Sequence, residues 1–131
     1  MVSIHHDNAV NIVSAGVCVY VSDVQRAHNW YREVLGLRME MSPDGQSSRY
    51  AEPYSSEDRL TVFRLLQGGM DESRQGNVRL AFSVADLQAT VAALRSHGVR
   101  VARERDFDPG CSLRSVTVLD PDGNGIVLYE R

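Results

Sequence analysis

One sequence pattern occurs twice in this chain, and this repeat constrains the fold more than any other feature. Residues 17–36 read VCVYVSDVQRAHNWYREVLG, and residues 80–98 read LAFSVADLQATVAALRSHG. The aspartates Asp23 and Asp86 occupy the same place in the two copies and lie 63 residues apart. A repeat of this length is one supersecondary unit used twice. The rest of the chain can be placed relative to these two copies.

The first copy predicts a β-strand followed by an α-helix. Val17, Val19 and Val21 recur at every second position, which is typical of a strand with one apolar face. The carboxylate of Asp23 is a good N-cap for the helix, and Gly36 is a typical C-terminal stop. Trp30 and Tyr31 of this helix are expected in the core, and His28 is expected on the surface. Three further strands are predicted at residues 37–41, 48–52 and 59–66. The first unit therefore has the order βαβββ.

The second copy predicts the same order of elements. Apolar residues alternate over 78–84, Asp86 caps the following helix, and Gly98 ends it. His97, at the end of this helix, is expected on the surface. Three strands are predicted at residues 99–105, 113–119 and 126–129, with a hairpin turn of sequence DPDGNG before the last one.

The two units predict a single α+β domain over residues 1–131. Its βαβββ modules cover about residues 12–68 and 77–131, and a Gly-rich polar linker at 67–77 joins them. Each module is expected to form a mixed sheet with its helix on one face.

Composition and charge exclude several classes of partner. The chain has 131 residues, 43% of them hydrophobic and 24% charged, as in ordinary soluble domains. Its net charge of −3 and the lack of a basic stripe argue against nucleic acid or an anionic membrane as a partner. No apolar run approaches the roughly 18 residues that a membrane span needs. The first residues have no signal-peptide features, so Cys18 and Cys111 are expected as reduced thiols in the cytoplasm.

Three segments carry a resemblance to a known family: VSD before the first helix, WYREVLG at its end, and LDPDGNGIVLYE at the C-terminus. With the repeated βαβββ plan, they make residues 12–131 similar to the vicinal oxygen chelate superfamily. This superfamily includes glyoxalase I, extradiol dioxygenases, fosfomycin-modifying enzymes and bleomycin-resistance proteins. The resemblance implies curved sheets that form a ligand-binding cup, with the helices on the convex side. It also implies a homodimer, in which modules often pair across chains.

In metal-using members of the superfamily, four side chains in the cup hold a divalent ion. The resemblance places these positions at Gly16, Arg64, Arg79 and Val127 in this chain. Glycine and valine have no donor atom, and arginine stays protonated without a free lone pair. We therefore predict no metal and no other cofactor. The alternative is one divalent metal held by a displaced set such as His5, His6 or Glu52.

The strand alternation also predicts which side chains line the cup. The candidate ligand-binding residues are Tyr20, Arg64, Arg79, Ser83, Val127 and Tyr129. A guanidinium inside a partly dry cup is costly unless it is paired. Its partner is either a ligand anion or an acidic side chain, with Glu40, Glu52, Glu104 and Glu130 as the candidates. Tyr20 and Tyr129 either stack on an aromatic ligand or simply fill the cup.

Together these patterns favour a metal-free small-molecule-binding protein of the glyoxalase and bleomycin-resistance type, with no catalytic residue identified. The alternative is an enzyme of the superfamily: a lyase, isomerase or dioxygenase. Such an enzyme would use the displaced metal, or acid–base chemistry by Glu40, Glu52 or Tyr20. A third alternative is a structural module whose cup is filled by its own side chains.

Overall fold

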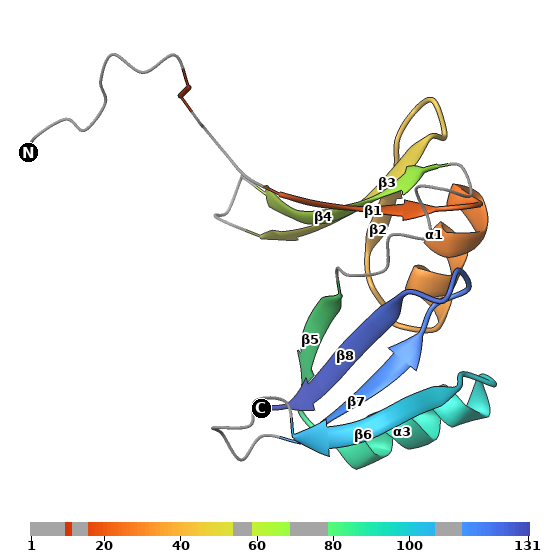
Figure 1. Cartoon of the computed structure of the whole chain (residues 1–131). Coiled ribbons are helices and arrows are strands. Elements are labelled where there is room, and N and C mark those ends of the chain that lie inside the picture. Colours follow the sequence, from red (N-terminus) through yellow and green to blue (C-terminus); the bar gives the residue numbers. More distant parts are fainter. Residues whose placement is uncertain (1–9, 12–15, 54–58, 69–78, 107–113) are drawn as a thin grey trace, which may run out of the picture.

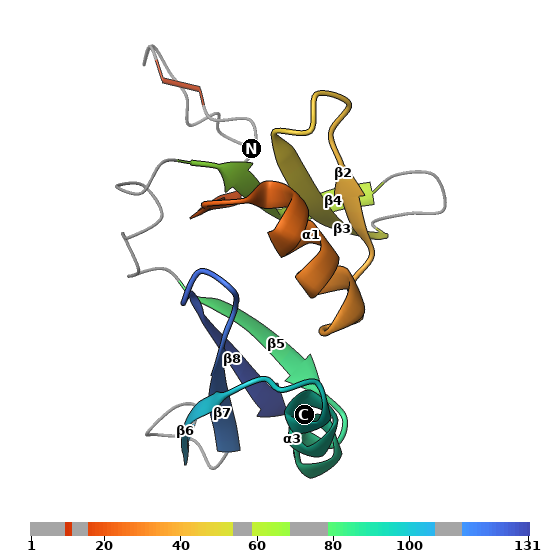
Figure 2. The ribbon, with the colours of Figure 1, turned by 90° about the vertical axis from the view of Figure 1, so that its right-hand side faces the viewer.

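The computed structural model describes residues 10–11, 16–53, 59–68, 79–106 and 114–131 (Figure 1). Residues 1–9 and 12–15, and residues 69–77 of the predicted linker 67–77, lie outside these described residues. Two four-stranded mixed sheets make up the fold, and each carries one helix on one face (Figures 1 and 2). The predicted α+β class with two βαβββ units is confirmed.

The first sheet, sheet 1, has the strand order β1-β4-β3-β2. Its strands are β1 (Val17–Val21), β4 (Arg59–Gln67), β3 (Ser47–Pro53) and β2 (Met39–Met41). The pair β1–β4 is parallel and the other two pairs are antiparallel. Helix α1 (Val24–Glu33) connects β1 to β2.

The second sheet, sheet 2, has the equivalent order β5-β8-β7-β6. Its strands are β5 (Leu80–Val84), β8 (Gly125–Glu130), β7 (Arg114–Leu119) and β6 (Val101–Asp106). The pair β5–β8 is parallel, and β7 is antiparallel to both of its neighbours. Helix α3 (Leu87–Ser96) connects β5 to β6.

The repeated aspartates and glycines define the ends of the two helices as predicted. Oδ1 of Asp23 accepts a hydrogen bond from the backbone N–H of Arg26 at 3.1 Å, and Oδ1 of Asp86 accepts one from Ala89 at 3.0 Å. Beyond the helices, Gly36 and Gly98 adopt φ values of 72° and 75°. Glycine is favoured there because other residues reach this left-handed conformation only at a cost.

Apolar side chains fill the space between each sheet and its helix. In sheet 1, Val21, Phe63 and Leu65 face α1 and are almost fully buried, with Tyr31 of the helix beside them. In sheet 2 the buried residues are Val116, Val118, Ile126 and Leu128, which belong to one cluster with Val91 and Leu94 of α3. Burial of such side chains is the main stabilising contribution to the fold.

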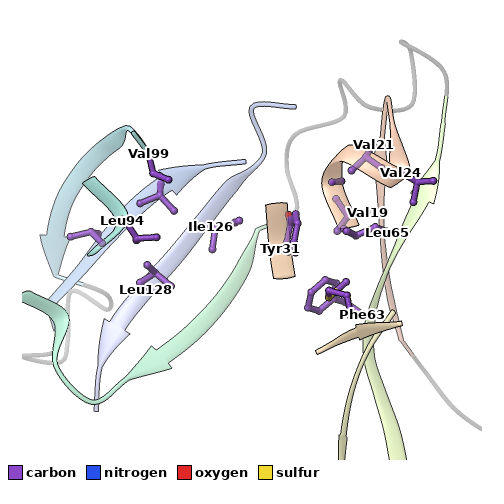
Figure 3. Packing of buried hydrophobic residues seen from close by; sticks show 14 of the residues in the cluster. Val19, Val21, Val24, Tyr31, Phe63, Leu65, Leu94, Val99, Ile126 and Leu128 are labelled. Atoms are coloured by element: carbon purple, nitrogen blue, oxygen red, sulfur yellow. The ribbon is translucent and has the colours of Figure 1, made fainter. Parts of the chain in front are cut away.

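The two modules meet through the helix-bearing side of sheet 1. The rings of Phe63 in β4 and Phe82 in β5 lie 6.0 Å apart, and the hydroxyl of Tyr31 donates to Asp120 before β8. Figure 3 shows Tyr31 between Ile126 of sheet 2 and the buried residues of sheet 1. The opposite side of sheet 1 therefore points away from the second module.

His28 corrects one expectation from the sequence. It is 6% exposed, and its Nδ1 lies 2.7 Å from the hydroxyl oxygen of Ser48 in β3. The prediction of a surface position was wrong because His28 lies one turn after the buried Val24, on the side of α1 that faces the sheet. Burial lowers the pKa of His28, and the nearby charge of Arg32 lowers this pKa further. His97 is exposed, as predicted.

Candidate functional site

Sheet 1 has one side that its helix does not cover, and we call this side open face 1. Cys18, Tyr20, Val62 and Arg64 lie on it, alternating along β1 and β4 with buried residues such as Leu65. Tyr20 and Val62 are each 38% exposed, an unusual amount for large apolar or aromatic side chains in a sheet. The predicted alternation of β1 and β4 is therefore confirmed, and it brings Tyr20 and Arg64 onto one surface.

Arg64 occupies the centre of a row of side chains across open face 1. In the strand register it lies between Cys18 of β1 and Arg49 of β3, and Arg49 in turn pairs with Glu40 of β2. Arg49 forms an ion pair with Glu40 at 3.1 Å and donates a 3.1 Å hydrogen bond to Oγ1 of Thr61. Arg64 has no ion pair among the residues that the structure describes. Its positive charge is thus left without a carboxylate partner there.

The uncovered side of sheet 2, open face 2, carries the other predicted ligand-binding residues. In the register, Ala81 lies beside Val127, and Ser83 lies beside Tyr129. Ser83 is exposed, whereas Val127 and Tyr129 are partly exposed. The structure thus groups Ser83, Val127 and Tyr129 on one surface.

Arg79 lies at the edge of open face 2, immediately before β5, and its side chain crosses Gly125 at the start of β8. A Cβ atom at Gly125 would lie 1.9 Å from Nη1 of Arg79 and 3.5 Å from Cγ2 of Thr117. Only glycine leaves this space free for the guanidinium, since any other residue places a Cβ in it. Like Arg64, Arg79 has no ion pair within the described part of the chain.

The strand registers confirm that the parallel strand pairs of the two modules, β1–β4 and β5–β8, are equivalent. Cys18 pairs with Arg64 in sheet 1, and Ala81 pairs with Val127 in sheet 2. Both members of the second pair lie 63 residues after their counterparts, the offset found in the repeat. Because open face 1 points away from the second module, Arg64 and Arg79 do not face each other within one chain.

Among the described residues, no ion pair joins Arg64 or Arg79 to the candidate glutamates. Glu40 pairs with Arg49, Glu52 accepts a 3.2 Å hydrogen bond from the hydroxyl of Tyr50, and Glu130 accepts one of 2.9 Å from the backbone of Leu87. The fourth candidate, Glu104, belongs to the segment whose side chains are not described.

The residues at the four metal-ligand positions do not fit a divalent ion. Gly16 and Arg79 come just before β1 and β5, and Arg64 and Val127 lie in β4 and β8. None of these four side chains has a lone pair to offer a metal ion. Across the described ranges there is no group of three or more His, Cys, Asp or Glu that could hold a metal. Of the displaced set, His5 and His6 lie outside the described residues, and Glu52 is exposed on β3.

Arg49 is the residue of this surface that the sequence did not single out. The sequence predicted that Arg49 lies in a strand, residues 48–52. It did not predict the neighbours of Arg49, because they depend on how β3 pairs with β4. That register shifts between Tyr50 and Ala51, and no local sequence pattern marks the shift. The strand pairing is therefore what places this cation on open face 1.

Comparisons with known proteins agree with this architecture. The family model described as Glyoxalase/Bleomycin resistance protein/Dioxygenase superfamily matches residues 11–128. The lactoylglutathione lyase of Haemophilus influenzae is 28% identical over 116 residues, which are 84% of this chain and 86% of that protein. The probable chloroplastic lactoylglutathione lyase of Arabidopsis thaliana is 29% identical over 82% of this chain, and the match spans only 32% of the plant protein.

Among solved structures, TnmS3, an antibiotic binding protein from Streptomyces sp. CB03234, has 26% sequence identity and a TM-score of 0.63. The match covers 94% of this chain and 98% of the TnmS3 chain. In the described residues, no helix has the length and apolar character required to cross a membrane.

Proposed function

Because this chain belongs to the Glyoxalase/Bleomycin resistance protein/Dioxygenase superfamily, we propose that it binds a small organic anion between open sheet faces without a metal ion. The observation that carries this proposal is the replacement of metal ligands by Arg64 and Arg79. Neither guanidinium has an ion pair within the described residues, and a guanidinium binds carboxylate or phosphate groups through paired hydrogen bonds. Ligand binding would supply the missing negative charge.

The remaining residues of the two faces favour an aromatic or partly apolar ligand. Tyr20 presents a ring on open face 1, and Val127 and Tyr129 present apolar surface on open face 2. Small-molecule sites usually combine such apolar lining with a few placed polar groups. Ser83, beside Tyr129 in the register, adds a hydroxyl that can donate or accept.

The proposed cup requires a second copy of the chain. Open face 1 points away from the second module of its own chain, since Phe63 and Phe82 meet on the other side of sheet 1. In a homodimer, open face 1 of one chain would cover open face 2 of its partner. Arg64 and the partner's Arg79 would then lie on opposite walls of one cavity.

A second candidate function is an enzyme, and the relatives named lactoylglutathione lyase favour it. This chain would then be a lyase, isomerase or dioxygenase of the superfamily. The acid–base groups would be Glu40, Glu52 or Tyr20, or a metal would be held at a displaced site. The carboxylate of Glu40 is already used in the ion pair with Arg49. TnmS3, whose title gives it as an antibiotic binding protein, supports the binding function instead.

The proposal is tested by titrating benzoate into the untagged full-length protein by calorimetry, with metal content measured on the same sample. Arg64→Gln and Arg79→Gln should each weaken binding about tenfold or more, since each removes a charge-assisted contact. Arg32→Gln, at an exposed arginine of α1 on the helix-bearing side of sheet 1, should leave the affinity unchanged. Equal affinity in all three variants would contradict the proposal.

The same samples separate the two candidate functions. Stoichiometric bound metal together with lactoylglutathione lyase activity that a chelator abolishes would establish the enzyme. Benzoate binding that persists in chelator, without such turnover, would support the binding protein. Sedimentation at micromolar concentration should show a dimer, and a strict monomer that still binds benzoate would rule out the shared cup.

A further inference from the structure

A groove with a volume of about 620 Å³ lies between α3 and β7, on the helix-bearing side of sheet 2. Its apolar lining consists of Leu87, Val91 and Ala92 from the helix and Val116 from the strand. Val91 and Val116 are buried against the helix-bearing side, so the groove lies on the opposite side of sheet 2 from Val127. It is therefore distinct from the proposed cup and would stay open in a dimer formed through the open faces.

The equivalent place in the first module carries a polar contact. His28 corresponds to Val91 in the repeat, 63 residues away. Ser48 corresponds to Val116, because Ser48 precedes the partner of Arg64 in β3, and Val116 precedes the partner of Val127 in β7. His28 and Ser48 form a 2.7 Å hydrogen bond that ties α1 to β3. Two valines cannot form such a bond, so Val91 and Val116 connect α3 to β7 through apolar packing alone.

Four charged side chains line this groove, and the two acidic ones accept hydrogen bonds from the backbone of α3. Oδ1 of Asp86 accepts from the backbone N–H of Ala89 at 3.0 Å, and Oε1 of Glu130 accepts from Leu87 at 2.9 Å. Arg95, in the last turn of α3, and Arg114, at the start of β7, have no ion pair within the described part of the chain. The four charges of the lining sum to zero, but the two guanidiniums are the charged groups that can still pair with a ligand anion.

From these features we infer that the groove is a second ligand site, which binds a small organic anion with an apolar body. The apolar body lies on Leu87 and Ala92, with the mostly buried Val91 and Val116 beneath it, and the acidic group binds the guanidinium of Arg95. We assign the anion to Arg95 because the carboxylate of Glu130 accepts from Leu87 at the N-terminal end of α3, whereas Arg95 lies in the last turn of this helix. The volume falls within the range of about 300–1,000 Å³ that is usual for small-molecule pockets.

The test uses the full chain labelled with ¹⁵N and titrated with 1-naphthoate, followed by two-dimensional NMR. We expect saturable shifts of the amides of Val91, Ala92 and Val116. The neutral analogue 1-naphthylmethanol should bind at least threefold more weakly, because it cannot use the guanidinium. Arg95→Gln should weaken naphthoate binding about threefold to tenfold, a range typical of a partly exposed charge contact. Arg32→Gln, at the repeat-equivalent position on α1, should not change it.

A pair of neighbouring substitutions then tests occupancy of the groove itself. Ala92→Phe fills the groove and should abolish these shifts, whereas Ala93→Phe, at an exposed position of α3 outside the lining, should preserve them. Shifts confined to Cys18, Arg64 or Val127 would overturn the inference and would support only the proposed cup. No saturable binding, or equal binding in Ala92→Phe, would also overturn it. The proposed cup is tested separately, by comparing the benzoate affinity of Arg64→Gln with that of the wild type.

Discussion

The hydroxyl of Tyr31 in α1 donates a 2.7 Å hydrogen bond to Oδ2 of Asp120, which lies 89 residues later in the turn before β8. Tyr31 is fully buried and Asp120 is 5% exposed. The same carboxylate also accepts from the backbone of Asp122 and from both the backbone and side chain of Asn124. Burial raises the pKa of Tyr31, and the charge of Asp120 raises this pKa further, so the hydroxyl remains a donor. This contact ties the last hairpin of sheet 2 to the first helix.

Tyr31→Phe should therefore destabilise the protein by about 1.5–3 kcal/mol, the usual contribution of a hydrogen bond to a charged group. The aromatic packing with Phe63, at 6.0 Å between ring centroids, should survive the change. Urea unfolding followed by tryptophan fluorescence measures the loss. Tyr50→Phe is the matched control, because the hydroxyl of Tyr50 donates to an exposed Glu52. The loss of that hydrogen bond should lower the free energy of unfolding by about 1 kcal/mol or less. Equal losses in the two variants would show that the contact does not couple the modules.

The buried His28 predicts a loss of stability in mild acid. Its pKa is lowered in the folded protein from a normal value of 6.5, first by burial and then by Arg32. The unfolded chain therefore takes up this proton more readily than the folded one. The stabilising contribution is fully present above pH 6.5 and is lost as the pH falls toward the lowered folded-state pKa. His28→Gln should flatten the stability profile between about pH 7 and 5. His97→Gln, at the exposed histidine, should keep the wild-type slope.

The repeat made most of this fold predictable, because its two signals are local. Period-two alternation identified the strands, and Asp23 and Gly36, with their counterparts Asp86 and Gly98, marked the helix ends. The 63-residue offset also predicted that Arg64 and Val127 occupy equivalent positions in the two modules. The strand registers agree, since Arg64 lies beside Cys18 and Val127 lies beside Ala81. The alternation along a strand determines on which side of the sheet a residue lies. It was therefore sufficient to predict which side chains lie on the two open faces.

Contacts between elements could not be predicted in the same way. The burial of His28 depends on Ser48, which faces it from another strand. The place of Arg49 beside Arg64 depends on a register shift within β3. The outward direction of open face 1 depends on Phe63 meeting Phe82 across the two modules. Each of these features depends on a tertiary contact between different elements, and a local sequence pattern does not contain that information.

The contrast between Arg64 and Arg49 gives a third prediction, about stability. Arg64 has no ion pair among the described side chains, and it lies opposite another arginine in the register. Arg64→Gln should leave the free energy of unfolding unchanged or raise it by a few tenths of a kcal/mol, since like charges opposite each other repel. Arg49→Gln removes the contacts to Glu40 and Thr61 and should cost about 0.5–1 kcal/mol. Thermal unfolding of both variants in parallel measures whether each substitution raises or lowers the stability. A clear loss in Arg64→Gln would reveal a partner for that guanidinium in the folded chain.

The close approach of Arg79 to Gly125 gives the last prediction. In Gly125→Ala the new Cβ would lie 1.9 Å from Nη1 of Arg79, so the guanidinium must leave its place over β8. The flexible end of a side chain moves at little cost, and the stability should fall by about 1 kcal/mol or less. Benzoate affinity should nevertheless fall as it does in Arg79→Gln, and the double variant Arg79→Gln with Gly125→Ala should bind no worse than Arg79→Gln alone.

Gly123→Ala is the control for this prediction, because Gly123 has a φ of 83° and its added Cβ meets no atom within 4 Å. This variant should lose about 1 kcal/mol of stability through backbone strain and keep its benzoate affinity. The two substitutions thus separate strain in the turn from displacement of the arginine. Full benzoate affinity in Gly125→Ala would mean that Arg79 reaches the anion from another position, and that its place over Gly125 is irrelevant to binding.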